Sequence, residues 1–74
     1  MKLTFQGEDS WGRPVYKDER GVLWKDVDPR TGYEPNLCII VDGSFDGEPC
    51  DNMNDIKGYE GVELEFIPRR IMWY

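Results

Sequence analysis

The chain of 74 residues contains no histidine and no alanine. Histidine is the commonest general acid or base at neutral pH and the commonest zinc ligand, so its absence removes the main support for an enzyme or a zinc site. Alanine is the strongest helix former. Its absence, beside eight glycines, five prolines and many aromatic residues, favours strands over helices. We therefore expect an all-β protein that is not an enzyme and has no cofactor.

Long hydrophobic runs are also lacking, because no apolar run approaches the roughly 18 residues of a membrane span. We expect a soluble protein with no membrane partner. We expect no signal peptide before the domain, and the chain has only two cysteines. Cys38 lies in an apolar run and is expected in the core, whereas Cys50 lies in a polar segment. Reduced thiols in the cytoplasm are the favoured interpretation, and a disulfide between the two remains open.

Positive charge is scarce in residues 42 to 68, where Lys57 is the only basic residue beside eight acidic ones and the net charge is −7. A negative surface repels phosphate, so we expect no nucleic-acid partner. Residues 1–74 are short enough to form one domain with a marginal core, which often gains stability from a partner. A homodimer is therefore a further possibility. The eight acids are Asp42, Asp46, Glu48, Asp51, Asp55, Glu60, Glu63 and Glu65.

The clearest structural signal is the stretch from Trp11 to Val27, which we interpret as a β-hairpin. Its arms, Pro14–Lys17 and Val22–Asp26, contain the β-branched and aromatic residues that suit a half-buried strand. Between them, Asp18-Glu19-Arg20-Gly21 ends in a glycine that can adopt the positive φ of a type I turn with a bulge. Pro14 has no backbone N–H, so its arm lies at a sheet edge or begins there.

Three further segments have the pattern of strands. Met1–Gln6 and Val62–Ile67 alternate between apolar and polar residues, as half-buried strands do. Leu37–Val41 is apolar throughout and predicts a central strand covered on both faces. With the hairpin, these segments predict a small antiparallel sheet or partly open barrel of about five strands.

Turn-forming residues dominate the segments between these strands. Asp28–Asn36 and Asp42–Asn54 contain glycines and prolines that are typical of loops. One short helix near residues 52–57 is compatible with Asp51 as its cap and Gly58 as its stop.

Several residues could carry chemistry, but a simpler interpretation is favoured for each. The loop Asp42–Glu48 has oxygen side chains at alternate positions, as the first half of a calcium loop does. Its closing glutamate would stand where the chain has Met53, so two consecutive turns are the better interpretation. Glu63 and Glu65 fit the solvated face of a strand, and Cys50 has no histidine to activate it. We expect no metal site and no catalytic residue.

Large aromatic residues in loops either fold back onto the core or anchor an interface. Trp73 lies in the final segment, Arg69–Tyr74, which is either a closing strand or a partner-binding tail. The segment with a net charge of −7 adjoins these loop aromatics and forms an acidic edge. We therefore predict that another protein binds at Tyr33, Phe45, Asp46, Glu48, Tyr59 and Trp73.

Some of these residues also carry a resemblance to a known family. They are Trp11-Gly12-Arg13-Pro14-Val15-Tyr16-Lys17-Asp18, then Gly21, Lys25-Asp26-Val27, Leu37-Cys38 and Phe45-Asp46-Gly47-Glu48-Pro49. Together they resemble a large polyvalent protein-associated domain, over about residues 3 to 50. The resemblance implies a cytoplasmic accessory module of phages and conjugative elements, with no established chemistry and no catalytic residues to carry over.

Three functional hypotheses follow from the sequence. The first is a non-enzymatic, cytoplasmic protein-interaction module of a mobile element, binding through its aromatic loops and one acidic edge. The alternative is a nucleic-acid-mimicking inhibitor that occupies a DNA-binding enzyme, which requires carboxylates along one continuous face. An enzyme comes third, because it would need a deep pocket holding two carboxylates with strongly displaced pKa values.

Overall fold

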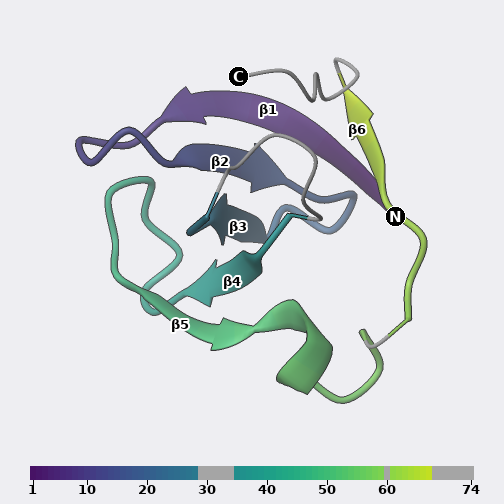
Figure 1. The fold of residues 1–74 in the computed structure, drawn as a ribbon. Helices are drawn as coiled ribbons and strands as arrows, with labels where there is room; N and C mark the ends of the chain where they lie inside the picture. The colour runs from purple at the N-terminus through teal and green to yellow at the C-terminus, as the bar shows by residue number, and fades with distance from the viewer. Residues whose placement is uncertain (29–34, 60, 68–74) are drawn as a thin grey trace.

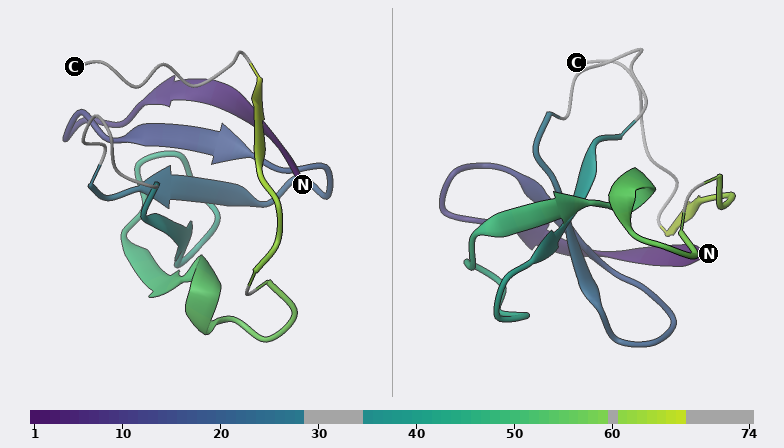
Figure 2. Two further views of the ribbon diagram at one scale, coloured as in Figure 1. Left: turned by 45° about the vertical axis from the view of Figure 1, so that its right-hand side comes forward. Right: turned by 90° about the horizontal axis from the view of Figure 1, so that it is seen from below.

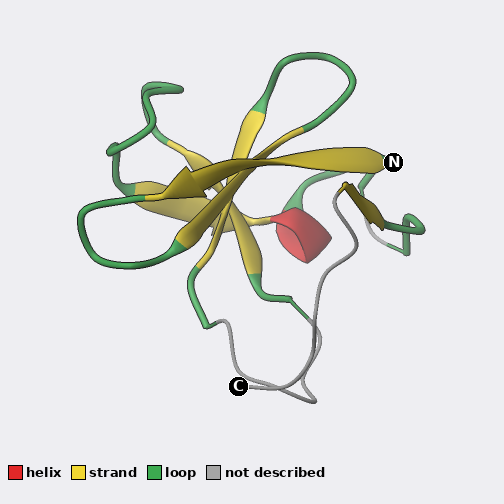
Figure 3. Cartoon of the chain, turned by 90° about the horizontal axis from the view of Figure 1, so that it is seen from above, coloured by secondary structure: helices red, strands yellow, loops and turns green. Residues whose placement is uncertain are grey.

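The computed structural model describes residues 1–28, 35–59 and 61–67. These residues form one open, strongly twisted sheet of six strands in the order β5-β4-β3-β2-β1-β6 (Figure 1; Figure 3). The all-β prediction is therefore confirmed. The elements are β1 (Lys2–Glu8), β2 (Pro14–Lys17), β3 (Leu23–Asp26), β4 (Leu37–Ile40), β5 (Pro49–Asn52), the 3-10 turn η1 (Met53–Asp55) and β6 (Glu65–Ile67).

The predicted hairpin is formed by β2 and β3, with Tyr16 opposite Trp24. Its turn closes through the Asp18 N–H, which donates to the Val22 carbonyl at 2.9 Å, and Gly21 has the expected positive φ of 85°. Asp18 itself is buried, and its Oδ1 accepts the backbone N–H groups of Arg20 and Val22. A buried carboxylate thus organises a turn that the sequence marks only as polar.

The same turn occurs once more, between β1 and β2. The Asp9 N–H donates to the Arg13 carbonyl at 3.0 Å, and Gly12 has φ of +79°. Asp9 is buried like Asp18, and its Oδ1 accepts the N–H groups of Trp11 and Arg13. The pattern Asp-x-x-Gly therefore marks both turns, and β2 begins at Pro14 without lying at an edge.

The first strand is longer than Met1–Gln6 because it continues through a bulge. The pairing register with β2 shifts between Phe5 and Gly7, and Gly7 adopts φ of +127°. The Phe45 ring packs over this position, and a Cβ at Gly7 would lie in van der Waals contact with it, at 3.4 Å. The backbone conformation of the bulge is therefore what requires glycine here.

The sheet is mixed, which corrects the prediction that it is antiparallel. β6 pairs parallel with β1, with Leu3 opposite Phe66, and only residues 65 to 67 of the predicted strand Val62–Ile67 are extended. β5 and β6 run in the same direction at opposite edges, so the chain after η1 must return across the sheet before β6 begins (Figure 2). The alternation of residues 62 to 67 indicates a strand but carries no information on its direction.

The prediction that Asp42–Asn54 is a loop is wrong for the second half of this segment, which contains β5. Pro49, Cys50, Asp51 and Asn52 are not typical strand formers, but they pair with β4 at the edge of the sheet, where a first-residue proline is tolerated. The predicted helix is reduced to η1, and its cap is Asn52 rather than Asp51, because the Asn52 Oδ1 accepts the Asn54 N–H at 2.9 Å.

The two faces of the sheet are covered differently. Consecutive side chains of a strand point to opposite faces, so Trp24 and Lys25 of β3 lie on opposite faces of the sheet. We call these the Trp24 face and the Lys25 face. The Trp24 face carries the main core, made of Leu3, Tyr16, Trp24, Leu37 and Met53. β4 is buried on both faces as predicted, because Leu37 belongs to the main core and Cys38, opposite Lys25, is buried on the other face. β4 is next to an edge strand rather than central. Within the described residues, no helix is long and apolar enough to cross a membrane.

Candidate protein-binding surface

The most exposed large apolar side chain among the described residues is Trp11, which is 78% accessible to solvent. It lies at the tip of the turn between β1 and β2. The Arg13 guanidinium lies over its ring, 5.6 Å from the centroid. Trp11 therefore presents most of its ring to any approaching molecule.

The Trp11 turn is anchored by the buried Asp9 carboxylate. Besides the two backbone N–H groups at Oδ1, its Oδ2 accepts from Arg13 Nε at 2.9 Å and from Lys25 Nζ at 2.7 Å. Burial raises the pKa of Asp9, but the hydrogen bonds from Lys25, Arg13 and Trp11 outweigh it and hold the pKa well below the usual range. The carboxylate is thus ionised at neutral pH, and its hydrogen bonds to the turn hold the turn in place from the buried side.

Lys25 connects this turn to the loop between β4 and β5. Its side chain is fully buried, and Nζ donates to the Gly47 carbonyl at 2.7 Å as well as to Asp9. A second link joins the Ser10 N–H to Asp46 Oδ1 at 2.9 Å. The turn and the loop therefore form one continuous surface, which we call the Trp11 surface: Trp11, Asp42, Phe45, Asp46 and Glu48.

The loop of residues 42 to 48 consists of consecutive turns that use their own polar groups. The Gly43 N–H donates to the Ile40 carbonyl, and Asp42 Oδ1 accepts from both the N–H and the hydroxyl of Ser44. These bonds from Ser44 lower the pKa of Asp42. The residues that the structure describes contain no group of three or more His, Cys, Asp or Glu side chains able to hold a metal ion.

The predicted binding residues divide between two faces of the sheet. Phe45, Asp46 and Glu48 lie together in the loop over the Lys25 face, where Phe45 is half-buried against Gly7. Tyr59 lies on the other face, with its ring 5.2 Å from that of Trp24 and its hydroxyl accepting from Arg20. Phe45 and Tyr59 thus fold back onto the protein. Tyr33 and Trp73 lie outside the described residues, as does the segment Arg69–Tyr74.

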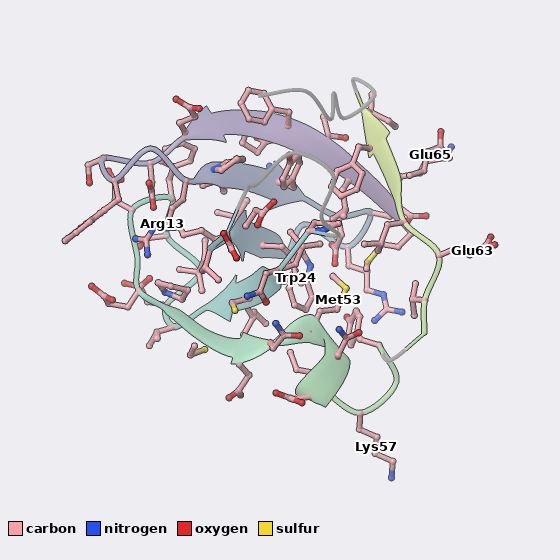
Figure 4. All side chains as sticks on the ribbon, in the orientation of Figure 1. Arg13, Trp24, Met53, Lys57, Glu63 and Glu65 are labelled. Atoms are coloured by element: carbon pink, nitrogen blue, oxygen red, sulfur yellow. The ribbon has the colours of Figure 1, made fainter. Side chains whose placement is uncertain are left out.

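Of the eight acids between residues 42 and 68, the seven that the structure describes lie at both edges of the sheet. Asp42, Asp46, Glu48, Asp51 and Asp55 follow the loop, β5 and η1 at one edge. Glu63 and Glu65 point outward at or near β6, at the other edge (Figure 4). This division gives no support to a nucleic-acid mimic, which would need the carboxylates on one continuous face.

The two cysteines are both free thiols. Cys38 is buried, and this burial raises its pKa. Cys50 is exposed on β5 and donates a weak hydrogen bond to the Ile39 carbonyl at 3.3 Å.

Three residues of the site, Asp9, Trp11 and Lys25, are not found by sequence reasoning, and Asp9 begins the Asp-x-x-Gly turn that contains Trp11. Trp11 stands in an Asp-x-x-Gly turn, and that pattern could have indicated an outward-pointing side chain. Lys25 alternates with Trp24 in a hairpin arm and would be expected to face solvent, because nothing local shows that the distant loop covers it.

Gly47 offers a direct test of how tightly the loop packs. A Cβ at this position would lie 2.5 Å from Ile40 Cγ2 and from Asp42 Oδ1. We expect Gly47→Ala to lower the free energy of unfolding by about 1–3 kcal/mol, because overpacking displaces the loop from Lys25. Urea unfolding measures this, with Glu48→Ala as the neighbouring control that should leave stability unchanged. Equal midpoints for the two variants would contradict tight packing.

Comparisons with family models, with curated proteins and with solved structures gave no match. The resemblance to a large polyvalent protein-associated domain therefore stays a prediction.

Proposed function

We propose that this chain is a non-enzymatic protein-interaction module that binds another protein through the Trp11 surface. The observation that carries the proposal is an exposed tryptophan on a turn held by a buried carboxylate. Tryptophan is enriched among the residues that dominate binding energy, and a turn ordered before binding loses little entropy when it docks.

The charge of the loop beside Trp11 favours one kind of partner, because the nearby Arg13 is already paired with Asp9. Asp42, Asp46 and Glu48 are all exposed on the adjoining loop. A partner with an apolar pocket bordered by lysines or arginines would complement this surface. A second copy of the chain would bring like charges together, and anionic lipid or nucleic acid would be repelled. We therefore favour a different protein over the homodimer.

The setting of the module is part of the proposal. The resemblance over residues 3 to 50 supports a cytoplasmic accessory module of a mobile element, and the two free thiols are compatible with a reducing compartment.

The experiment begins with a photo-crosslinking amino acid at Ser10, which is exposed and leaves the neighbouring Trp11 in place, and at Lys57 as a control whose side chain points away from the protein (Figure 4). A protein crosslinked only from position 10 is purified, and its affinity for the chain is measured by calorimetry. We expect Trp11→Ala to weaken binding by at least about 30-fold, since a hot-spot residue contributes about 2 kcal/mol or more. Lys57→Ala should bind like the wild type.

Salt separates the charged part of the interaction from the apolar part. Affinity should fall as sodium chloride rises, and Glu48→Lys, at an exposed position of the same loop, should remove part of that dependence. Equal affinity of the wild type and Trp11→Ala for the purified partner would refute the proposal, as would a nucleic acid or a lipid vesicle that binds with the same dependence on Trp11.

A further inference from the structure

The outer edge of β1 is only partly covered by the residues that the structure describes. β1 has seven residues, and β6 pairs with the first three of them, Lys2, Leu3 and Thr4 (Figure 1). Beyond Thr4, no described strand borders β1 on this side. We call this part of the strand, residues 5 to 8, the open edge of β1. Unpaired backbone groups at such an edge are a template for a further strand.

The chain leaves β6 at the point where the open edge begins. β6 runs parallel to β1, and its last residue, Ile67, is opposite Thr4. Further extension in the same direction would therefore place the next residues beside Phe5 and then along the open edge. Seven residues follow Ile67. They span about 23 Å when extended, whereas the four residues of the open edge span about 13 Å, so the segment is long enough to cover it.

Pro68 is compatible with pairing to β1. The Glu65 N–H donates to the Met1 carbonyl at 2.9 Å, so the backbone groups of Glu65 face β1. The backbone groups of consecutive strand residues point alternately to the two sides, so residues 67 and 69 of a continued strand would face β1 and residues 66 and 68 would face away. Proline is tolerated in an edge strand where its missing N–H would point away from the neighbouring strand.

The side chains on the two segments also suit each other. Phe5 and Ile67 are 42% and 39% exposed, so apolar surface lies where the open edge begins. The segment Arg69–Tyr74 has two arginines followed by four apolar or aromatic residues, and Glu8 is exposed at the far end of the open edge. Pairs of opposite charge and pairs of large apolar side chains both stabilise neighbouring strands.

We propose that residues 68 to 71 continue β6 as a parallel strand and cover the open edge of β1. The occupant is this chain's own segment rather than a strand of another protein, because its attachment at Ile67 gives it an effective concentration in the millimolar range. A second copy is disfavoured further by its net charge of −6. The covered edge would exclude strand addition by other chains, so partners are left with surfaces such as the Trp11 surface.

Amide hydrogen exchange of the full chain, measured by NMR, tests the pairing directly. In the proposed strand the Arg69 N–H faces β1 and the Arg70 N–H faces away. After correction for the rates of an unstructured chain, we expect the Arg69 N–H to exchange at least about ten-fold more slowly than the Arg70 N–H. Nuclear Overhauser contacts should join residue 69 to residues 5 to 7, at every protein concentration.

Two proline substitutions provide a matched pair. Arg69→Pro and Arg70→Pro each remove one positive charge and add one proline, so they differ in the direction of the N–H that is lost. We expect Arg69→Pro to abolish the contacts between residues 68–71 and β1, and Arg70→Pro to keep them. The amide signals of β2, β3 and β4 should match the wild type in both variants, which separates loss of the added strand from loss of the fold.

Three results would overturn the proposal. The first is equal exchange of the Arg69 and Arg70 amides in the wild type, and the second is equal loss of the contacts to β1 in the two proline variants. The third is contacts to the open edge that appear only as the protein concentration rises, which would assign this edge to a second copy. None of these results bears on binding at the Trp11 surface.

Discussion

Replacing Asp9 with leucine is expected to lower the free energy of unfolding by about 3–5 kcal/mol, because the change leaves the Lys25 ammonium buried without its carboxylate. It also removes the acceptor for two backbone N–H groups of the Trp11 turn. A domain of this size has about 3–5 kcal/mol of stability in total, so the variant should be largely unfolded at 25 °C. Circular dichroism and urea unfolding measure the change.

Lys25→Met should lower the free energy of unfolding less than Asp9→Leu does. This order tests whether the cost of Asp9→Leu comes from leaving the lysine buried without its carboxylate. Without Lys25, the Asp9 carboxylate keeps Arg13 Nε and both backbone donors, and only the Gly47 carbonyl loses its partner. The cost should be about 1–3 kcal/mol for an unsatisfied polar group. In a double-mutant cycle the two changes should couple by at least about 1 kcal/mol. Strictly additive costs would contradict a direct ion pair.

The pH dependence of unfolding provides the accompanying check. The pKa of Asp9 is lowered in the folded protein from an ordinary value of 3.8, so its contribution to stability is complete above that pH. It is lost as the pH falls below 3.8 toward the folded pKa. The wild type should lose stability in this range, and Lys25→Met should lose less, because the lysine lowers the pKa of Asp9. If the free energy of unfolding depended on pH in the same way for the wild type and Lys25→Met, the effect of Lys25 on the pKa of Asp9 would be contradicted.

Local patterns account for the parts of the fold that the sequence predicts. Residues 14 to 26 contain two strand-forming arms around an Asp-x-x-Gly turn, and this information is confined to a short stretch. The apolar run from Leu37 similarly predicts a strand buried on both faces, because few other structures cover all of its side chains. For the hairpin and for the strand at Leu37, the residue pattern that predicts the element is contained within the segment itself.

The missed features depend on contacts between distant segments. β5 exists because β4 offers hydrogen bonds at its edge, not because Pro49 to Asn52 favour extended structure. The parallel pairing of β6 depends on how the chain crosses the sheet. Lys25 is buried because the loop of residues 42 to 48 covers it, although that loop is 17 or more residues away in sequence. Local propensity contains none of this information.

The candidate binding residues show the same limit. Phe45 and Tyr59 are aromatic and lie in loops, but both pack against the protein, at Gly7 and at Trp24. Trp11 is exposed because the turn directs it outward and Asp9 fixes the turn. Residue type and loop position therefore identify candidates, but only the packing shows which aromatic side chain is available to a partner.

Truncating Trp24 to alanine is the second change expected to unfold the protein, with a cost of about 3–5 kcal/mol. Trp24 is completely buried in β3, lies between Tyr16 and Ile39 on the neighbouring strands, and packs against Tyr59. Trp24→Phe should cost less, because an aromatic ring is kept in the core and the losses are limited to part of the indole volume and the hydrogen bond from Nε1 to Asp18 Oδ2, at 3.1 Å. Urea unfolding of both variants gives the difference.

The matched control is the same substitution at the other described tryptophan. Trp11→Ala removes an identical side chain from an exposed position, so stability should change by no more than about 0.5 kcal/mol. The two variants should then fail in opposite ways, since Trp24→Ala loses the fold and Trp11→Ala keeps the fold but loses the partner. A large loss of stability in Trp11→Ala would mean that this ring supports the Asp9 turn, and the reason for assigning it to binding would disappear.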